Sequence, residues 1–124
     1  MYYLGIDVGS VSTDFVVMDD KQIIVDQLYL KTKGAPIDAV KDGLRQLSGH
    51  FRDEDICGVG TTGSGRALAS AIAGGDVVKN EITTHAVAAA TLDPEIRTVL
   101  EIGGQDSKII LLRDGVISDF AMNT

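Results

Sequence analysis

The sequence predicts an α/β fold whose elements follow one another in the order β-β-β-α-β-α-α-β-β-β. Runs of β-branched and apolar residues with short connections dominate the first and last thirds, whereas the middle carries apolar residues at helical spacing. Strands joined by short turns become antiparallel neighbours, and strands joined through helices become parallel neighbours. We therefore expect a mixed sheet with helices on its outside.

Three strands are predicted in the first third of the chain, over residues 3–7, 13–18 and 23–30. The first two are apolar runs, and the third is rich in β-branched residues. The segment after the second run, residues 19–21 (Asp-Asp-Lys), is typical of a tight turn. Because both connections are short, these strands are expected to be antiparallel neighbours.

The apolar period then changes to that of a helix. The residues that share one helical face are Ile37, Val40, Leu44 and Leu47. Pro36 suits the first turn of this helix, and Gly49 suits the position just after its end. Gly43 lies inside the helix, where it costs about 1 kcal/mol relative to Ala, which indicates that another group packs closely against it.

A fourth strand over residues 56–61 leads through a glycine-rich turn into an alanine-rich helix over residues 66–73. Asn80 is placed to cap a further helix over residues 81–92, and residues 93–94 (Asp-Pro) close it.

Three more strands are predicted in the last third, over residues 98–102, 108–112 and 116–120. Asp114 and Gly115 form a hairpin signal between the last two. No linker or low-complexity segment divides the chain, so one domain is expected.

The composition excludes several classes of protein. The 124 residues are 44% hydrophobic and 23% charged, as in a folded domain with one modest core. A formal net charge of -7 argues against nucleic acid as a partner. No stretch approaches the ~18 apolar residues of a membrane span, and the start lacks the basic region of a signal peptide, so a cytoplasmic protein is expected. The single cysteine, Cys57, excludes an internal disulfide, and its apolar neighbours predict an inert thiol buried in a strand.

The first candidate site lies in residues 5–10 (Gly-Ile-Asp-Val-Gly-Ser), where a carboxylate precedes a turn that contains glycine. Asp7 is expected at the C-terminal end of its strand, where open α/β sheets gather ligands. Its carboxylate can contact a hydrated Mg²⁺ or can accept hydrogen bonds from nearby amides in the turn, and both interpretations stay open. The backbone of Gly9, Ser10 and Val11 would form the turn that meets phosphates.

Residues 101–108 (Glu-Ile-Gly-Gly-Gln-Asp-Ser-Lys) repeat this design. Glu101 and Asp106 flank the glycines, and a buried carboxylate is costly unless it is paired or bound to a metal. Gln105 can orient an attacking water or serve as a turn amide. Lys108 can reach a phosphate or Glu101, or lie exposed at a sheet edge. Two such turns, each followed by an apolar strand, suggest a nucleoside triphosphate held between two hairpins.

Three other features have both a functional and a structural interpretation. Glu81 can contact Mg²⁺ or water, or can simply be a favourable charge at a helix N-terminus. His85, one turn later, is interpreted as structural because no second ligand accompanies it at metal spacing. Residues 60–66 resemble a phosphate-binding loop at a helix N-terminus but lack the Gly-Lys-Ser/Thr ending of a P-loop, so an ordinary strand-to-helix turn is the alternative.

These motifs resemble the N-terminal half of the ATPase domains of the acetate kinase, sugar kinase, heat-shock chaperone and actin superfamily. Residues 5–10 look like the first phosphate motif of that superfamily, and residues 101–106 look like the second. More specifically, the chain resembles the BadF/BadG/BcrA/BcrD ATPases, the activators of 2-hydroxyacyl-CoA dehydratases and of benzoyl-CoA reductase. The segments that carry this likeness are residues 62–66 (Thr-Gly-Ser-Gly-Arg), 80–82 with 85–86, 103–108 and 122–123 (Met-Asn).

The resemblance implies a ribonuclease-H-like fold and a protein that binds ATP–Mg²⁺ and hydrolyses it. Hydrolysis would be coupled to low-potential electron transfer to a CoA-ester dehydratase or reductase. The residues implied are Asp7 and Glu101 for Mg²⁺, then Gly9, Ser10, Val11, Gly103, Gly104 and Gln105 around the phosphates, and Gln105 with Glu81 or Asp106 to position water. A small-molecule kinase of the same superfamily and a non-enzymatic actin-like assembly module are the alternatives.

The sequence departs from the family pattern at three places. Activators often carry a lysine where this chain has Asp14, and many carry Asp where this chain has Glu101. In the family, a cysteine that follows the segment matching Asn123 helps to bind a 4Fe–4S cluster bridging two subunits, which implies a homodimer. Because this sequence stops at Thr124, the resemblance implies the N-terminal subdomain of a longer protein, without cluster ligands or the adenosine side. On its own, such a subdomain is expected to bind ATP weakly or not at all and to be inactive.

Overall fold

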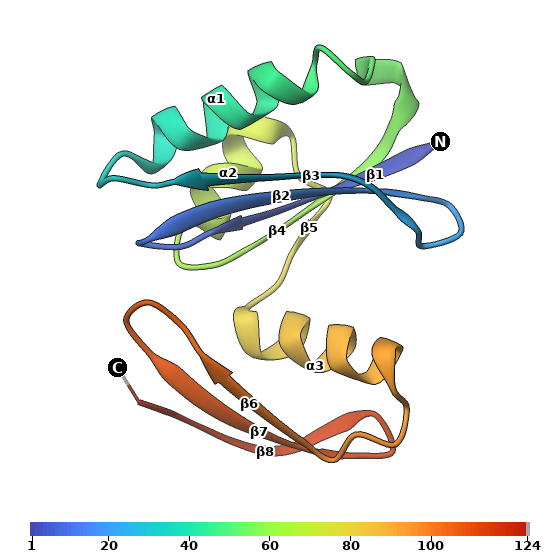
Figure 1. The fold of residues 1–124 in the computed structure, drawn as a ribbon, viewed down its shortest axis with the longest axis vertical. Coiled ribbons are helices and arrows are strands. Elements are labelled where there is room, and N and C mark those ends of the chain that lie inside the picture. Colours follow the sequence, from blue (N-terminus) through green and yellow to red (C-terminus); the bar gives the residue numbers. More distant parts are fainter. Residues whose placement is uncertain (124) are drawn as a thin grey trace. The chain divides into compact units, whose positions relative to one another are not determined.

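The computed structural model describes residues 1–123, which divide into two compact units (Figure 1). The first runs from Met1 to Lys79, and the second begins at Asn80. Each unit has its own sheet and its own buried core.

The first unit is built on a five-stranded mixed sheet. Its strands are β1 (Tyr2–Val8), β2 (Ser12–Asp19), β3 (Ile24–Lys31), β4 (Ile56–Thr62) and β5 (Val77–Val78). Their order is β3-β2-β1-β4-β5, with β1 antiparallel to β2 and parallel to β4. The parallel pairing brings the C-terminal ends of β1 and β4 to the same edge of the sheet.

Two helices, α1 (Pro36–Leu47) and α2 (Arg66–Ala73), lie on one face of this sheet (Figure 1). A short 3₁₀ helix, Asp53–Asp55, precedes β4. The buried core beneath the helices consists of Leu4, Ile6, Val8, Phe15, Val17, Val40, Leu47 and Ala69. Because side chains alternate along a strand, the inward Ile6 and Val8 leave Asp7, which lies between them, on the opposite face.

The close packing predicted at Gly43 is confirmed. Gly43 is buried in α1, and a Cβ added there would overlap the ring of Phe15 on β2. Phe15 is among the largest fully buried side chains of the first unit. The helix therefore tolerates a residue of low helix propensity because its absent side chain makes room for an aromatic ring.

The prediction of a buried Cys57 is wrong, because the residue is exposed. Tyr2 pairs with Ile56 and Tyr3 pairs with Gly58, so Cys57 is the extra residue of a bulge between β1 and β4. A bulged residue is unpaired and leaves the regular alternation of the strand. Apolar neighbours in the sequence therefore did not place this thiol in the core.

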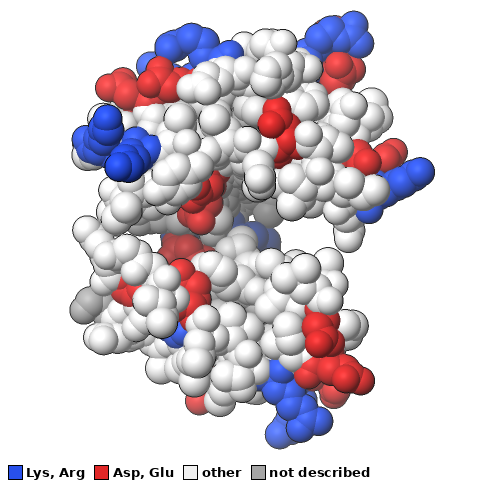
Figure 2. Space-filling view, in the orientation of Figure 1, with Lys and Arg blue, Asp and Glu red and all other residues white. Residues whose placement is uncertain are grey.

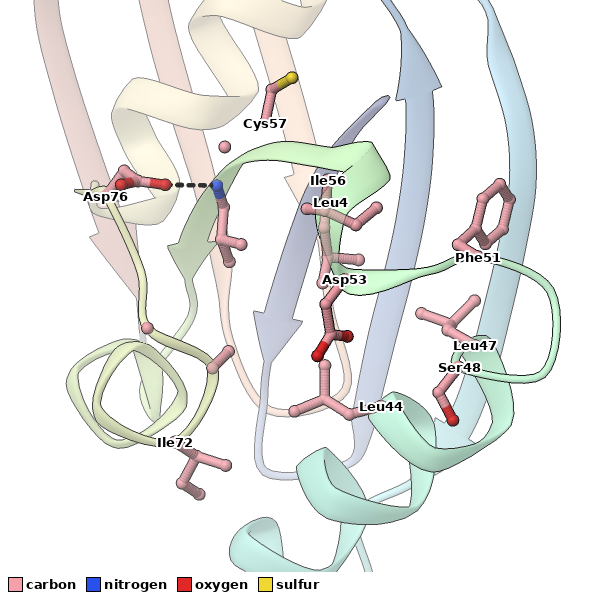
Figure 3. Close-up of a pocket in the computed structure, with 14 residues that line it drawn as sticks. Leu4, Leu44, Leu47, Ser48, Phe51, Asp53, Ile56, Cys57, Ile72 and Asp76 are labelled. Atoms are coloured by element: carbon pink, nitrogen blue, oxygen red, sulfur yellow. Dashed lines mark hydrogen bonds between the residues drawn. The ribbon is translucent and has the colours of Figure 1, made fainter. Parts of the chain in front are cut away.

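A hollow of about 540 Å³ lies on the helix-covered face of the first unit, and Figure 3 shows the residues that line it. Apolar side chains from α1, β4 and α2 line it, among them Leu44 and Ile72. Asp76 borders one side, and its carboxylate accepts a hydrogen bond from the Val59 amide at 2.8 Å. Asp7 lies on the other face of the sheet, so this hollow is separate from the candidate site described below.

The second unit is a three-stranded antiparallel sheet with one helix. Its elements are α3 (Glu81–Leu92), β6 (Thr98–Ile102), β7 (Ser107–Arg113) and β8 (Val116–Asn123), and the strand order is β6-β7-β8. Ala86 of α3 packs with Ile110 and Leu112 of β7, so the helix covers one face of this sheet. The predicted cap is confirmed, since Asn80 Oδ1 accepts a hydrogen bond from the Thr83 amide at 2.9 Å.

The predicted α/β fold and the order of its main elements are confirmed, with the 3₁₀ helix and the short β5 as additions. The prediction of one mixed sheet is confirmed only in part. The first strands form the expected mixed sheet with helices, whereas the last three form a separate antiparallel sheet. Asp114 and Gly115 both have positive φ, 54° and 78°, as the predicted hairpin turn requires.

The surface carries charges of both signs. Figure 2 shows Asp and Glu side chains beside Lys and Arg side chains on the visible face of each unit. Over residues 1–123, no helix has the length and apolar character needed to cross a bilayer.

Candidate functional site

The turn between β1 and β2 is tied to the end of β3. The Gly9 amide donates to the Ser12 carbonyl at 2.9 Å, which closes the turn. Thr32, which follows β3, binds this turn through two hydrogen bonds. Its hydroxyl donates to the Gly9 carbonyl at 2.8 Å, and its amide donates to the Val11 carbonyl at 2.9 Å. No hydrogen bond within residues 1–123 uses the amide of Ser10 or Val11 as its donor. These exposed amides are therefore available to a ligand.

Thr32 is a residue that the sequence prediction missed. Its hydroxyl also pairs with that of Thr13 at 2.9 Å, and both residues are buried. A buried hydroxyl pair that also binds the turn carbonyl fixes the position of Gly9. No local signal marks Thr32, because its partners lie about twenty residues away in the sequence.

Asp7 lies where β1 meets both of its neighbours. It is in register with Asp14 on β2 and with Thr62 on β4. Gly63 follows Thr62 with φ of 93°, and a Cβ added there would lie 2.6 Å from Asp7 Oδ1. The Asp7 carboxylate therefore rests against the glycine backbone at the C-terminal edge of the sheet.

The glycine-rich loop after β4 is a packed strand-to-helix turn. The Gly65 amide donates to the Val8 carbonyl at 3.0 Å, and the Thr61 hydroxyl donates to the Arg66 carbonyl at 2.8 Å. Arg66 also donates from Nη1 to the Gly63 carbonyl at 3.0 Å. These bonds favour the structural interpretation of residues 60–66, because they fasten the end of β1, where Asp7 lies, to α2.

The turn between β6 and β7 has the same pattern as the first. The Gly103 amide donates to the Asp106 carbonyl at 2.8 Å. Gly104 and Gln105 are exposed, and neither amide donates a hydrogen bond to another group in residues 1–123. Glu101 is half-buried and lies on β6 directly opposite Lys108 on β7.

Lys108 is buried, so an exposed edge lysine is the wrong alternative. Its Nζ lies 2.7 Å from Glu101 Oε2 and 3.5 Å from Asp106 Oδ1. Burial alone would lower the pKa of Lys108, but the hydrogen bond and charge of Glu101, with those of Asp106, outweigh it and hold the pKa above its ordinary value. The ammonium therefore stays charged inside the unit.

The two hairpins match position by position. In each, the glycine amide donates to the carbonyl three residues later, and the carboxylate lies two residues before that glycine. Asp7 and Glu101 are thus equivalent, and so are Asp14 and Lys108, which face them across the hairpin. The predicted likeness of the two hairpins extends to their hydrogen bonds, while the charge opposite the carboxylate differs.

Glu81 and His85 lie on α3 in the second unit. Glu81 is in the first turn, directly after the capping Asn80, where a negative charge is favourable. The Nδ1 atom of His85 is buried and has no hydrogen-bond partner within residues 1–123. The structure brings Glu101, Asp106 and Lys108 together in the second unit and places Asp7 in the first.

The donor chemistry of both hairpins fits Mg²⁺. Asp7 and Glu101 each offer carboxylate oxygens beside a turn with open amides, and Mg²⁺ keeps several waters while it binds one or two carboxylates and phosphates. No group of three or more His, Cys, Asp or Glu side chains in residues 1–123 is placed to hold a metal ion. An iron–sulfur cluster needs several thiolates, and this chain has Cys57 alone, so its own residues do not fit such a cluster.

Sequence comparisons identify the family of the chain. Residues 4–124 match the model of the BadF/BadG/BcrA/BcrD ATPase family. The chain is 34% identical to the (R)-2-hydroxyglutaryl-CoA dehydratase activating ATPase of Acidaminococcus fermentans and 39% identical to the activator of lactoyl-CoA dehydratase of Anaerotignum propionicum. Each match covers 99% of this chain and 47% of the relative, so the chain spans about half the length of these proteins.

Solved structures give the same result. The crystal structure of Acidaminococcus fermentans (R)-2-hydroxyglutaryl-CoA dehydratase component A matches with a TM-score of 0.82 and 32% identity, over 99% of this chain and 47% of that one. The activator of 2-hydroxyisocaproyl-CoA dehydratase from Clostridium difficile with bound ADPNP matches with a TM-score of 0.83 and 32% identity, over 99% and 46%. A putative N-acetylmannosamine kinase from Listeria monocytogenes, 13% identical with a TM-score of 0.65 over 94% of this chain and 49% of that one, shares the fold alone. The chain belongs to the BadF/BadG/BcrA/BcrD ATPase family.

Proposed function

We propose that this chain supplies phosphate-binding and Mg²⁺-binding residues to an ATPase. The observation that carries the proposal is the pair of matching hairpins. Each has a carboxylate two residues before its glycine and backbone amides that donate to no group in residues 1–123. Backbone amides at glycine turns bind phosphate oxygens, and nearby carboxylates bind a hydrated Mg²⁺. The relative that was solved with bound ADPNP supports a nucleotide as the ligand.

The geometry of each hairpin supports a role for its residues. Asp7 and Glu101 would contact the hydration shell of Mg²⁺. The residues whose backbone would surround the phosphates are Gly9, Ser10, Val11, Gly103, Gly104 and Gln105. When bound, Mg²⁺ would offset the negative charge that the phosphoryl oxygens carry. Gln105, exposed in the second turn, would orient the attacking water together with Glu81 or Asp106.

We infer the partner from the names of the relatives. They activate CoA-ester dehydratases, so the full-length protein would bind a CoA-ester dehydratase or reductase and couple ATP hydrolysis to electron transfer into it. A homodimer that shares a 4Fe–4S cluster belongs to the same proposal. The residues of this chain do not fit such a cluster, so its ligands would come from other parts of the full-length protein.

The proposal is tested by phosphate release from ATP in the full-length protein, without any phosphoryl acceptor. Asp7→Asn should lower the rate about 10–100-fold, the usual cost of losing a group that orients a metal's shell. Asp20→Asn, an exposed acid in the turn after β2, is the matched control and should leave the rate unchanged. Wild-type turnover in the Asp7 variant would overturn the proposal. Release that depends on an added acceptor would favour a kinase, and ATP-driven filaments without turnover would favour an assembly module.

A further inference from the structure

The second unit contains a compact charged cluster, formed by Lys108, Glu101 and Asp106 and called here the Lys108 cluster. The Lys108 side chain is 3% exposed, with its ammonium 2.7 Å from Glu101 and 3.5 Å from Asp106. One positive and two negative charges thus share a largely buried space. A buried ammonium loses its hydration and stays charged only where carboxylates replace that hydration.

Gly103 shows that the two carboxylates border the same space. A Cβ added there would lie 3.3 Å from Glu101 Oε1 and 3.5 Å from Asp106 Oδ1. Two carboxylates that border one space repel each other, and a cation between them offsets that repulsion. The structure supplies that cation from the protein itself, as the ammonium of Lys108.

The first hairpin carries an acid where the second carries Lys108. The position that matches Lys108 is Asp14, which faces Asp7 in register and accepts a hydrogen bond from the Ser12 hydroxyl at 3.1 Å. The two hairpins therefore share a backbone pattern but place opposite charges beside their carboxylates. Only the second hairpin has lysine at this position, so we expect the role of Lys108 to involve the carboxylates of that hairpin.

We propose that Lys108 is a positioning residue that occupies the place a metal ion would otherwise take between Glu101 and Asp106. It holds Glu101 in one orientation, with Oε2 bound to the ammonium and Oε1 beside Gly103. It also keeps the second hairpin from binding a divalent cation of its own. The purpose of this orientation rests on the proposed function. In that orientation, Glu101 would contact the hydration shell of the one Mg²⁺ that binds together with ATP.

The test compares the full-length wild type with Lys108→Met, Lys108→Arg and Arg113→Met. Lys108→Met keeps an unbranched side chain and removes its charge. Arg113 is an exposed cation on the same strand, so Arg113→Met controls for the change in net charge. Mn²⁺ binding to the nucleotide-free protein is measured by electron paramagnetic resonance, and its effect on the melting temperature is measured in parallel. Lys108→Met should bind one additional Mn²⁺, at least about tenfold more tightly than any such binding in the wild type, and should be stabilised by it.

The other variants define the outcome. Lys108→Arg and Arg113→Met should bind Mn²⁺ as the wild type does, and adding Glu101→Gln to Lys108→Met should abolish the extra site. If Lys108→Met does not fold without metal, folding on addition of Mn²⁺ is the expected result. Wild-type Mn²⁺ binding in Lys108→Met, an extra site that survives Glu101→Gln, or no folding with Mn²⁺ would overturn the inference. None of these measurements uses ATP, so a wild type that fails to hydrolyse ATP would refute the proposed function alone.

Discussion

Lys108 and Glu101 lie directly opposite each other on β7 and β6, and their side chains join at 2.7 Å on the face that α3 covers. Glu101, whose carboxylate was expected to contact a metal ion, therefore also binds the buried ammonium of Lys108. The same contact links the stability of the second unit to the orientation of Glu101.

The first prediction concerns stability at high pH. The pKa of Lys108 lies above its ordinary value of 10.5, so its pair with Glu101 contributes fully below that pH and is lost as pH rises through the higher folded-state pKa. Removing one partner of a buried pair costs about 3 kcal/mol. We therefore expect urea unfolding in EDTA to show Lys108→Met less stable than wild type by a constant amount from pH 7 to about 10, with the difference shrinking above pH ~10.5. A difference that shrinks on going from pH 7 to 9 would contradict this.

A second prediction concerns the glycine that rests against Asp7. Gly63 has φ of 93°, and a Cβ there would overlap the Val8 carbonyl and the Asp7 carboxylate. Gly34 has φ of 68° with no atom within 4 Å of an added Cβ, so it serves as the control for backbone strain alone. Gly34→Ala should cost about 1 kcal/mol, and Gly63→Ala should cost at least about 3 kcal/mol because it adds a steric clash. Equal losses in urea unfolding would show that the close approach to Asp7 does not matter.

A third prediction uses the contact between Gly43 and Phe15. Alanine at Gly43 would favour the helix by about 1 kcal/mol, but the overlap with the ring should cost more, for a net loss of about 2 kcal/mol. In a Phe15→Leu background the ring is gone, so the added cost of Gly43→Ala should fall or change sign. Thermal unfolding of the four proteins measures this coupling. Additive effects would mean that the ring is not what requires glycine.

The element order was predictable because it depends on local periodicity. Asn80 capped its helix and Asp114-Gly115 formed its turn, since both depend on near neighbours in the sequence. The division into two sheets was not predictable, because the pattern of β6 says nothing about which strand it joins. Cys57 was misplaced because a bulge breaks the alternation that the prediction assumes.

The candidate site was also predictable only in part. Both glycine turns could be found from sequence, because a carboxylate before glycine is a local motif. The support for those turns could not be found, since Thr32 binds the Gly9 carbonyl from 23 residues away and the burial of Lys108 depends on tertiary packing. The residues proposed to contact a ligand are thus more visible in the sequence than those that hold them in place.

The most direct test of the central claim is the binding of ADPNP to the full-length protein by calorimetry, with Mg²⁺ and again with EDTA. We predict that Mg²⁺ strengthens binding at least about tenfold, because carboxylates and open amides alone do not offset the charge of a triphosphate. Asp7→Asn should remove most of that difference, and Asp20→Asn should keep it. Equal affinity with Mg²⁺ and with EDTA, or no binding in either condition, would contradict the account.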